Sequence, residues 1–145
     1  MSIDVRKDPL LNKFVNYIMK DGKKSLAIDL LNKTFEEMKA KGQKKPVESF
    51  KLAMDNVMPR IEVRPKRVGG SIYQVPQEVK QKRQLFLAAK WILESANGKK
   101  GTPFHKALAV ELIDAANETG NAVKKKLDVY KMAEANKAFA RFANR

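Results

Sequence analysis

The sequence contains no cysteine and only one histidine, and these shortages exclude several kinds of chemistry. Without cysteine the chain can form no disulfide, no thiolate zinc site and no cysteine nucleophile. His105 alone cannot build a histidine-rich metal centre, and no nucleophile-elbow motif suggests a Ser-His-acid triad around it. No apolar run is long enough to span a membrane, and the first residues lack the apolar region of an export signal. We therefore expect no enzyme, no metal or cofactor, and no membrane partner.

Acidic residues are also scarce relative to basic ones. The 145 residues include 30 Lys and Arg against 16 Asp and Glu, a net charge of +14, while 43% of the chain is hydrophobic. That apolar fraction and length suit one folded domain with a core. So much like charge repels itself in a compact state, and a polyanionic partner relieves the repulsion. Nucleic acid is the commonest such partner.

The positive charge is unevenly distributed along the chain. Residues 60–83 and residues 121–145 each hold seven basic and two acidic side chains, a net charge of +5. Residues 20–51 hold nine basic and five acidic side chains, whereas residues 103–120 have a net charge of −2. Clustering of this kind is typical of a nucleic-acid-binding face.

Residues 60–76 carry the most informative pattern, two runs rich in β-branched residues on either side of Gly69-Gly70. Two glycines can both adopt positive φ, which a two-residue hairpin turn requires. If these glycines form the loop, Arg67 lies opposite Ile72 and Lys66 lies opposite Tyr73, but the sequence alone leaves a register shifted by one residue open. A lone basic ribbon is marginal in water unless it packs on something else. A nucleic-acid groove or a folded RNA surface is the natural partner.

The rest of the chain shows apolar residues at helical spacing, bounded by glycine and proline. The connections are short, so we expect residues 1–145 to form a single, mainly α domain. A β-hairpin at about residues 60–76 should protrude between its third and fourth helices. Trp91 belongs to a strong apolar pattern and is expected in the core. The six predicted helices span about residues 9–20, 25–41, 46–58, 80–97, 104–119 and 122–142.

Candidate RNA-binding residues are the basic side chains of the ribbon and of the other positive segments, with two uncharged neighbours. Arginine offers phosphate a planar fork of donors. Tyr73 and Gln74 could stack on or hydrogen-bond to an exposed base, although packing of Tyr73 on a neighbouring side chain is an equal alternative. The predicted set is Lys23, Lys24, Arg60, Arg64, Lys66, Arg67, Tyr73, Gln74, Lys80, Lys82, Arg83, Lys99, Lys100, Lys124, Lys125, Lys126, Lys131, Lys137 and Arg141.

Three motifs in order resemble the bacterial and organellar family of small-subunit ribosomal protein seven. The ribbon sequence RVGGSIYQVP at 67–76 is similar to that family's hairpin, and KDGKKSLA at 20–27 to its first inter-helix turn. Residues 114–117, 122–125 and 131–140 resemble its C-terminal block, so the resemblance covers about residues 8–142. The chain departs from the family at Tyr130 and Arg141, where histidine is common, and in having only Arg6 and Lys7 as basic residues before Asp8.

The resemblance implies six helices and a ribbon, and a structural role in the small ribosomal subunit. It implies binding to the 3′ (head) domain of small-subunit ribosomal RNA and help in head assembly. The ribbon would lie near the exit-site transfer RNA and the messenger RNA exit channel, with small-subunit protein eleven among the neighbours. The protein would reside on ribosomes, in a bacterial cytoplasm or an organelle matrix, and no homo-oligomer is expected.

Two other classes of function remain open on the residues alone. A DNA-bending architectural protein could insert a basic β-arm into the minor groove, with Pro65 near its tip. A helical scaffold could instead use its basic faces to bind acidic proteins or membrane surfaces. An RNA-processing enzyme is the weakest candidate, because no catalytic constellation accompanies the basic residues.

Overall fold

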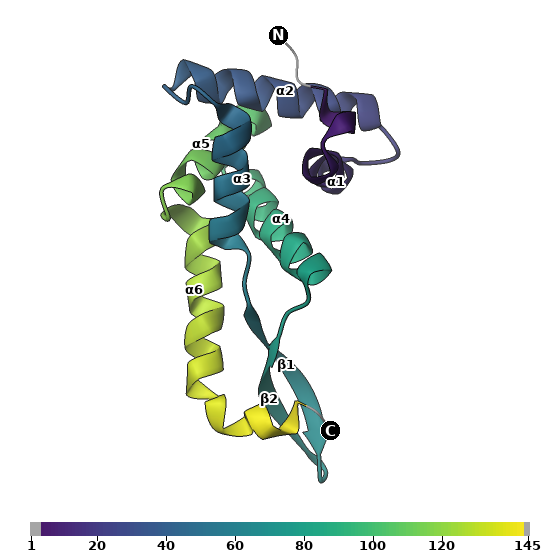
Figure 1. Ribbon diagram of the computed structural model, residues 1–145, viewed down its shortest axis with the longest axis vertical. Helices are drawn as coiled ribbons and strands as arrows, with labels where there is room; N and C mark the ends of the chain where they lie inside the picture. The colour runs from purple at the N-terminus through teal and green to yellow at the C-terminus, as the bar shows by residue number, and fades with distance from the viewer. Residues whose placement is uncertain (1–3, 144–145) are drawn as a thin grey trace.

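The computed structural model describes residues 4–143, and this part of the chain is mainly helical with one antiparallel hairpin between the third and fourth α-helices. The expected fold class is therefore confirmed. Figure 1 shows the helices α1 to α5 gathered at one end, while the hairpin and α6 extend to the other. The elements are η1 (Val5–Lys7), α1 (Pro9–Ile18), α2 (Lys24–Ala40), α3 (Pro46–Val57), β1 (Ile61–Val68), β2 (Ser71–Glu78), α4 (Gln81–Asn97), α5 (Phe104–Ala116), α6 (Gly120–Ala135) and η2 (Lys137–Phe142).

The first α-helix begins with an aspartate cap followed by proline. The Asp8 carboxylate accepts hydrogen bonds from the backbone N–H groups of Leu10 and Leu11, at 3.0 and 3.3 Å. Lys51 on α3 reaches the other carboxylate oxygen at 2.9 Å. The hydrogen bond from Lys51, supported by those two N–H groups, holds the pKa of Asp8 below its ordinary value despite partial burial. This one residue caps α1 and ties it to α3.

A continuous apolar core joins α1 to α5, which together form the helical end of the molecule. Phe50 on α3 is fully buried, and its ring meets Phe14 edge-on at 4.9 Å and Phe35 at 6.1 Å between centroids. Burying one such side chain contributes about 1.5–3 kcal/mol. Helix α5 packs against α2, α3 and α4 and so lies at the centre of this end. Trp91 packs against the core but stays half-buried.

The hairpin has the turn that the sequence predicts, and its register is the one in which Gly69 and Gly70 form the loop. Gly69 and Gly70 have φ values of 59° and 85°, so both occupy the left-handed region that a two-residue turn of this kind needs. Arg67 pairs with Ile72 and Lys66 with Tyr73. Pairing continues to Ile61 and Glu78, two residues beyond the predicted end of the second strand.

The sixth helix is shorter than predicted, and this prediction was wrong over its last turns. Helix α6 ends at Ala135, and the Asn136 side chain donates to the Met132 carbonyl at 2.8 Å. The chain then crosses as η2 to the hairpin (Figure 1). There Phe139 and Phe142 pack on Tyr73 of β2, with centroids 4.9 and 5.2 Å from its ring. The aromatic spacing that resembled a continuing helix instead docks the C-terminal segment.

The start of α6 is fixed by a close approach. Gly120 has φ of 92°, and a Cβ atom there would lie 2.9 Å from the Cβ of Asp114 on α5. Thr119 donates its hydroxyl to the Asp114 carbonyl at 3.0 Å. Farther along α6, the Tyr130 hydroxyl accepts a hydrogen bond from the backbone N–H of Arg60 at 2.9 Å. Helix α6 is thereby joined to the helical end at its start and to the base of the hairpin midway.

Candidate nucleic-acid interface

A buried carboxylate organises the base of the hairpin. Glu62 on β1 has only 9% of its side chain exposed, and its Oε1 accepts from Nε of Arg64 at 2.9 Å and from Nε of Arg83 at 2.7 Å. The hydrogen bond to Glu62 raises the pKa of the Arg83 guanidinium, which stays charged. Each arginine uses only Nε in this contact, so its terminal nitrogens keep their donors. The guanidinium groups of β1 and α4 are thus held side by side and half-exposed.

One face of the ribbon is occupied by the C-terminal segment. Lys66 donates from Nζ to the Ala143 carbonyl at 3.0 Å, and the Tyr73 ring is half-buried against Phe139 and Phe142. The Arg141 guanidinium lies 5.0 Å above the Phe142 ring. Of the two roles expected for Tyr73, stacking on a base or packing on a neighbouring side chain, this structure shows the packing, with η2 as the partner. Lys66 and Tyr73 are less available to a ligand than the sequence pattern implied.

The opposite face of the ribbon is open near the tip. The cross-strand register puts Pro65, Arg67, Ile72 and Gln74 on this face, and all four are exposed, Ile72 to 63%. Among residues 4–143, no acidic group lies within ion-pairing distance of Arg67. A cation, an amide and an apolar side chain are available together near the tip.

The basic strip continues from the ribbon into the start of α4. Arg60, Lys80 and Lys82 are exposed, and their side chains have no ion pair within the described part of the chain. Arg83 follows in the first turn of α4 and is held by Glu62. The structure therefore places Arg60, Arg64, Lys80, Lys82 and Arg83 around the base of the hairpin, and Lys66, Arg67, Tyr73 and Gln74 towards its tip.

The basic residues of α6 and η2 are divided between free and paired side chains. Lys124 and Lys131 are exposed and make no ion pair with any described residue. Lys125 instead pairs with Glu94 of α4 at 2.8 Å, and Lys137 pairs with Glu134 at 3.0 Å. Lys126 lies 5.6 Å above the Tyr130 ring. With Arg141 over the Phe142 ring, four of the six predicted residues of α6 and η2 have intramolecular partners, which reduces their availability to phosphate.

Two predicted pairs of lysines lie away from the ribbon. Lys99 contacts the buried Glu111 carboxylate at 3.1 Å and so neutralises a charge inside the helical end, while neighbouring Lys100 is exposed. Lys23 and Lys24 stand at the turn between α1 and α2, far from the ribbon tip (Figure 1). Sequence reasoning thus grouped residues that belong to separate surfaces.

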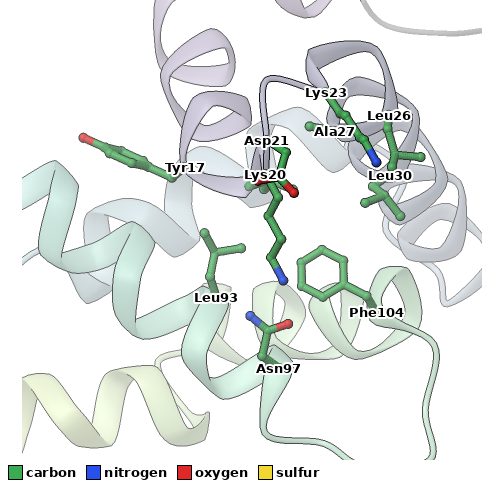
Figure 2. A pocket seen from close by; sticks show the side chains of 11 residues that line it. Tyr17, Lys20, Asp21, Lys23, Leu26, Ala27, Leu30, Leu93, Asn97 and Phe104 are labelled. Carbon is green, nitrogen blue, oxygen red and sulfur yellow. The ribbon is translucent and has the colours of Figure 1, made fainter.

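A pocket of about 410 Å³ opens beside the turn between α1 and α2. Leucine side chains of α2 and α4 and the Phe104 ring form its apolar walls, as Figure 2 shows. The same view shows the Lys20 side chain running across the pocket towards Asn97 and Phe104. No sequence motif indicated this pocket, because its walls come from four separate segments.

The comparisons with known proteins decide between the possible classes of function. The family described as Ribosomal protein S7p/S5e matches residues 2–137. The chain belongs to this family. It is therefore a structural, non-enzymatic protein of the small ribosomal subunit, located on the ribosome. The resemblance drawn from the three sequence motifs is confirmed.

Individual relatives are similar over nearly their whole length. The small ribosomal subunit protein uS7 of Thermosipho africanus is 50% identical over 138 residues, covering 95% of this chain and 89% of the relative. Its counterpart in Petrotoga mobilis is 53% identical over 135 residues, covering 93% and 87%. A Thermoanaerobacter protein of the same name is 49% identical over 144 residues, covering 96% and 92%. Family membership thus extends over the hairpin, α4 and α6 alike.

Proposed function

We propose that the protein binds the 3′ (head) domain of small-subunit ribosomal RNA and helps to organise assembly of the subunit head. Its hairpin would lie near the exit-site transfer RNA and the messenger RNA exit channel, with small-subunit protein eleven as a neighbour. The chain would act as one RNA-binding domain and as a single copy. The host compartment would be a bacterial cytoplasm or an organelle matrix.

The strip of cations from the hairpin into α4 is the observation that supports this function best. The side chains of Arg67, Lys80 and Lys82 are exposed and have no acidic partner among the described residues. Glu62 holds the side chains of Arg64 and Arg83 in place. Guanidinium groups held in place lose little conformational freedom on meeting phosphate, and they offer a planar fork. A folded RNA presents phosphates in a fixed arrangement, which such a preorganised strip can match.

The other predicted residues form secondary contacts in this proposal. Arg60, Gln74, Lys100, Lys124 and Lys131 are exposed and would meet phosphate or a base edge. The residues with intramolecular partners would contribute by their charge and through their remaining donors. This group contains Lys66, Tyr73, Lys99, Lys125, Lys126, Lys137 and Arg141.

The salt dependence of binding to a 3′-domain transcript tests the proposal. The triple variant Arg67→Ala, Lys80→Ala, Lys82→Ala should reduce the slope of log affinity against log salt by about 0.7–0.9 for each lost phosphate contact. A matched control removes three lysines that are paired with acids: Lys7→Ala, Lys45→Ala, Lys90→Ala. It changes the net charge equally and should alter the slope much less. If the salt-dependence slope of the Lys7, Lys45, Lys90 control variant falls as far as that of the Arg67, Lys80, Lys82 variant, the strip is not the RNA-binding surface.

Competition separates this function from its rivals. In a competition experiment, bent duplex DNA that displaces the transcript more effectively than an unrelated RNA of equal length would support the DNA-bending alternative. If the protein stays in heavy fractions after nuclease digestion of ribosomes, a scaffold for acidic proteins or membranes would fit better.

A further inference from the structure

The pocket beside the turn between α1 and α2 lies outside the ribbon and the α4 strip. Its walls are supplied by the end of α1, the first turns of α2, the end of α4 and the start of α5. A left-handed pair, Asp21 at φ 54° and Gly22 at φ 74°, makes the turn compact, and the Lys23 N–H donates to the Lys20 carbonyl at 3.0 Å. The turn therefore sets two lysines at the mouth of one cavity.

The lining combines a flat apolar interior with a polar rim. Phe104, Leu30 and Leu93 supply apolar surface, and Leu26 stands at the lip with 55% of its surface exposed. Polar side chains from α4 and from the turn converge on the same space (Figure 2). These polar groups, Lys20, Asp21, Lys23 and Asn97, make no side-chain hydrogen bond or ion pair with any residue from 4 to 143. They are free to meet a ligand.

We propose that this pocket receives one unstacked base of the ribosomal RNA, an inference that rests on the RNA-binding function proposed above. The base would lie against Phe104 and the leucines, since aromatic and apolar side chains hold splayed-out bases in single-stranded RNA. Asn97 offers both a donor and an acceptor to a base edge. Lys20 and Lys23 would meet the phosphates on either side of that nucleotide. The volume lies within the range of small-ligand pockets.

Charge complementarity favours a nucleotide over an apolar side chain of a neighbouring protein. An apolar side chain would use only the leucines and the Phe104 ring, and would leave the two lysines at the rim without a partner. A nucleotide uses the apolar interior, the amide and both cations together. One carboxylate, Asp21, opposes the two lysines, so the rim keeps a net positive charge.

Two exposed leucines provide a matched pair of variants. Leu26→Asp places a carboxylate at the lip of the pocket, whereas Leu52→Asp makes the same change on α3, at a side chain that is 50% exposed and outside the pocket lining. Both positions are exposed enough that thermal unfolding should be nearly unchanged. Affinity for a 3′-domain transcript should fall at least about fivefold in Leu26→Asp, the effect of losing one stacked base, and far less in Leu52→Asp.

Photo-crosslinking identifies the occupant directly. With benzoylphenylalanine at position 26 in assembled subunits, the expected product is a crosslink to one nucleotide of small-subunit RNA, absent when the probe is at position 52. A crosslink to another ribosomal protein, or equal affinities for the two aspartate variants, would overturn the base-binding proposal. Failure of the proposed function is a different result: the unmodified protein would then show no preference for the transcript over an unrelated RNA.

Discussion

The two ends of the molecule are held together by different interactions. The helical end has a core in which the Phe50 ring contacts both Phe14 and Phe35, and each of the three is less than 3% exposed. The arm, formed by β1, β2, the second half of α6 and η2, has no such centre. It is held by the pairing of β1 with β2, a ring cluster around Tyr73, a buried carboxylate, single hydrogen bonds and a few buried apolar side chains such as Val75 and Ala133.

The difference indicates a division between stability and recognition. Apolar burial at the helical end supplies most of the folding free energy, because it scales with the area removed from water. The arm buries little and can keep its cations exposed without weakening a core. Changes in the arm should therefore alter RNA binding while the protein stays folded, and changes in the core should do the reverse.

The largest effect should come from the core. Phe50→Ala removes a fully buried ring that contacts two others, and we expect the free energy of unfolding to fall by about 3–5 kcal/mol. Urea denaturation measures the loss. Leu52→Ala, at an exposed position on the same helix, should change it by less than about 0.5 kcal/mol. Equal losses of unfolding free energy in Phe50→Ala and Leu52→Ala would show that the buried core does not supply most of the stability.

The next effect concerns the carboxylate at the base of the hairpin. Glu62→Gln makes the protein more positive, so simple electrostatics predicts tighter binding to every polyanion. If Glu62 positions Arg64 and Arg83, affinity for the 3′-domain transcript should instead fall roughly tenfold, the scale of one charged hydrogen bond. Binding to heparin should strengthen in the same variant.

An exposed acid provides the control for Glu62. Glu94→Gln also removes one negative charge, but from a carboxylate with 47% of its side chain exposed. It should strengthen binding to heparin and to the transcript alike. Parallel behaviour of the two glutamine variants would show that Glu62 acts only through its charge.

A smaller effect is expected where η2 meets the hairpin. The double variant Phe139→Ala, Phe142→Ala removes two aromatic contacts with Tyr73, each worth about 0.5–1.5 kcal/mol. Hydrogen exchange at the hairpin amides should accelerate, while protection in α3 and α5 stays the same. Phe86→Ala, which removes an aromatic contact with Tyr17 at 5.8 Å, should leave exchange in the hairpin unchanged.

The smallest effect depends on pH and belongs to the helical end. The pKa of Asp8 is lowered in the folded state, chiefly by Lys51, so its stabilising contribution is present above the unfolded-state pKa and is lost as pH falls through the folded one. Asp8→Asn keeps a good helix cap without the charge. Urea unfolding measures the free energy of unfolding at neutral pH and at about pH 3. The decrease between the two pH values should be greater by about 0.5 kcal/mol in the wild type than in Asp8→Asn. Identical losses would assign no role to the charge.

The sequence predicted features that depend on neighbouring residues. Gly69 and Gly70 indicated a two-residue turn, which the structure has, while the exact pairing of the two strands was left open by one residue. Proline and aspartate at the start of α1 indicated its boundary for a similar local reason. The helical class followed from apolar spacing, and the position of the hairpin followed from Gly69-Gly70 between two runs rich in β-branched residues.

Features that depend on distant contacts were missed. The spacing of Met132, Phe139 and Phe142 fits a helix as well as it fits a docked segment, so periodicity could not reveal the break at Asn136. Glu62 was visible as the one acid among the bases of β1, a signal that could have indicated its place between two arginines. Its second partner comes from α4, which local patterns do not reveal.

Because α6 begins at Gly120, a small change of the helix direction there produces a large displacement at its far end. Sixteen residues of helix extend about 24 Å from Gly120 to the point where η2 begins. Tilting such a rod by about 5° moves its far end by roughly 2 Å, more than a hydrogen bond tolerates. Any larger side chain at Gly120 would push against Asp114 at the pivot, and the displacement would emerge, magnified, at the aromatic contact beneath the ribbon.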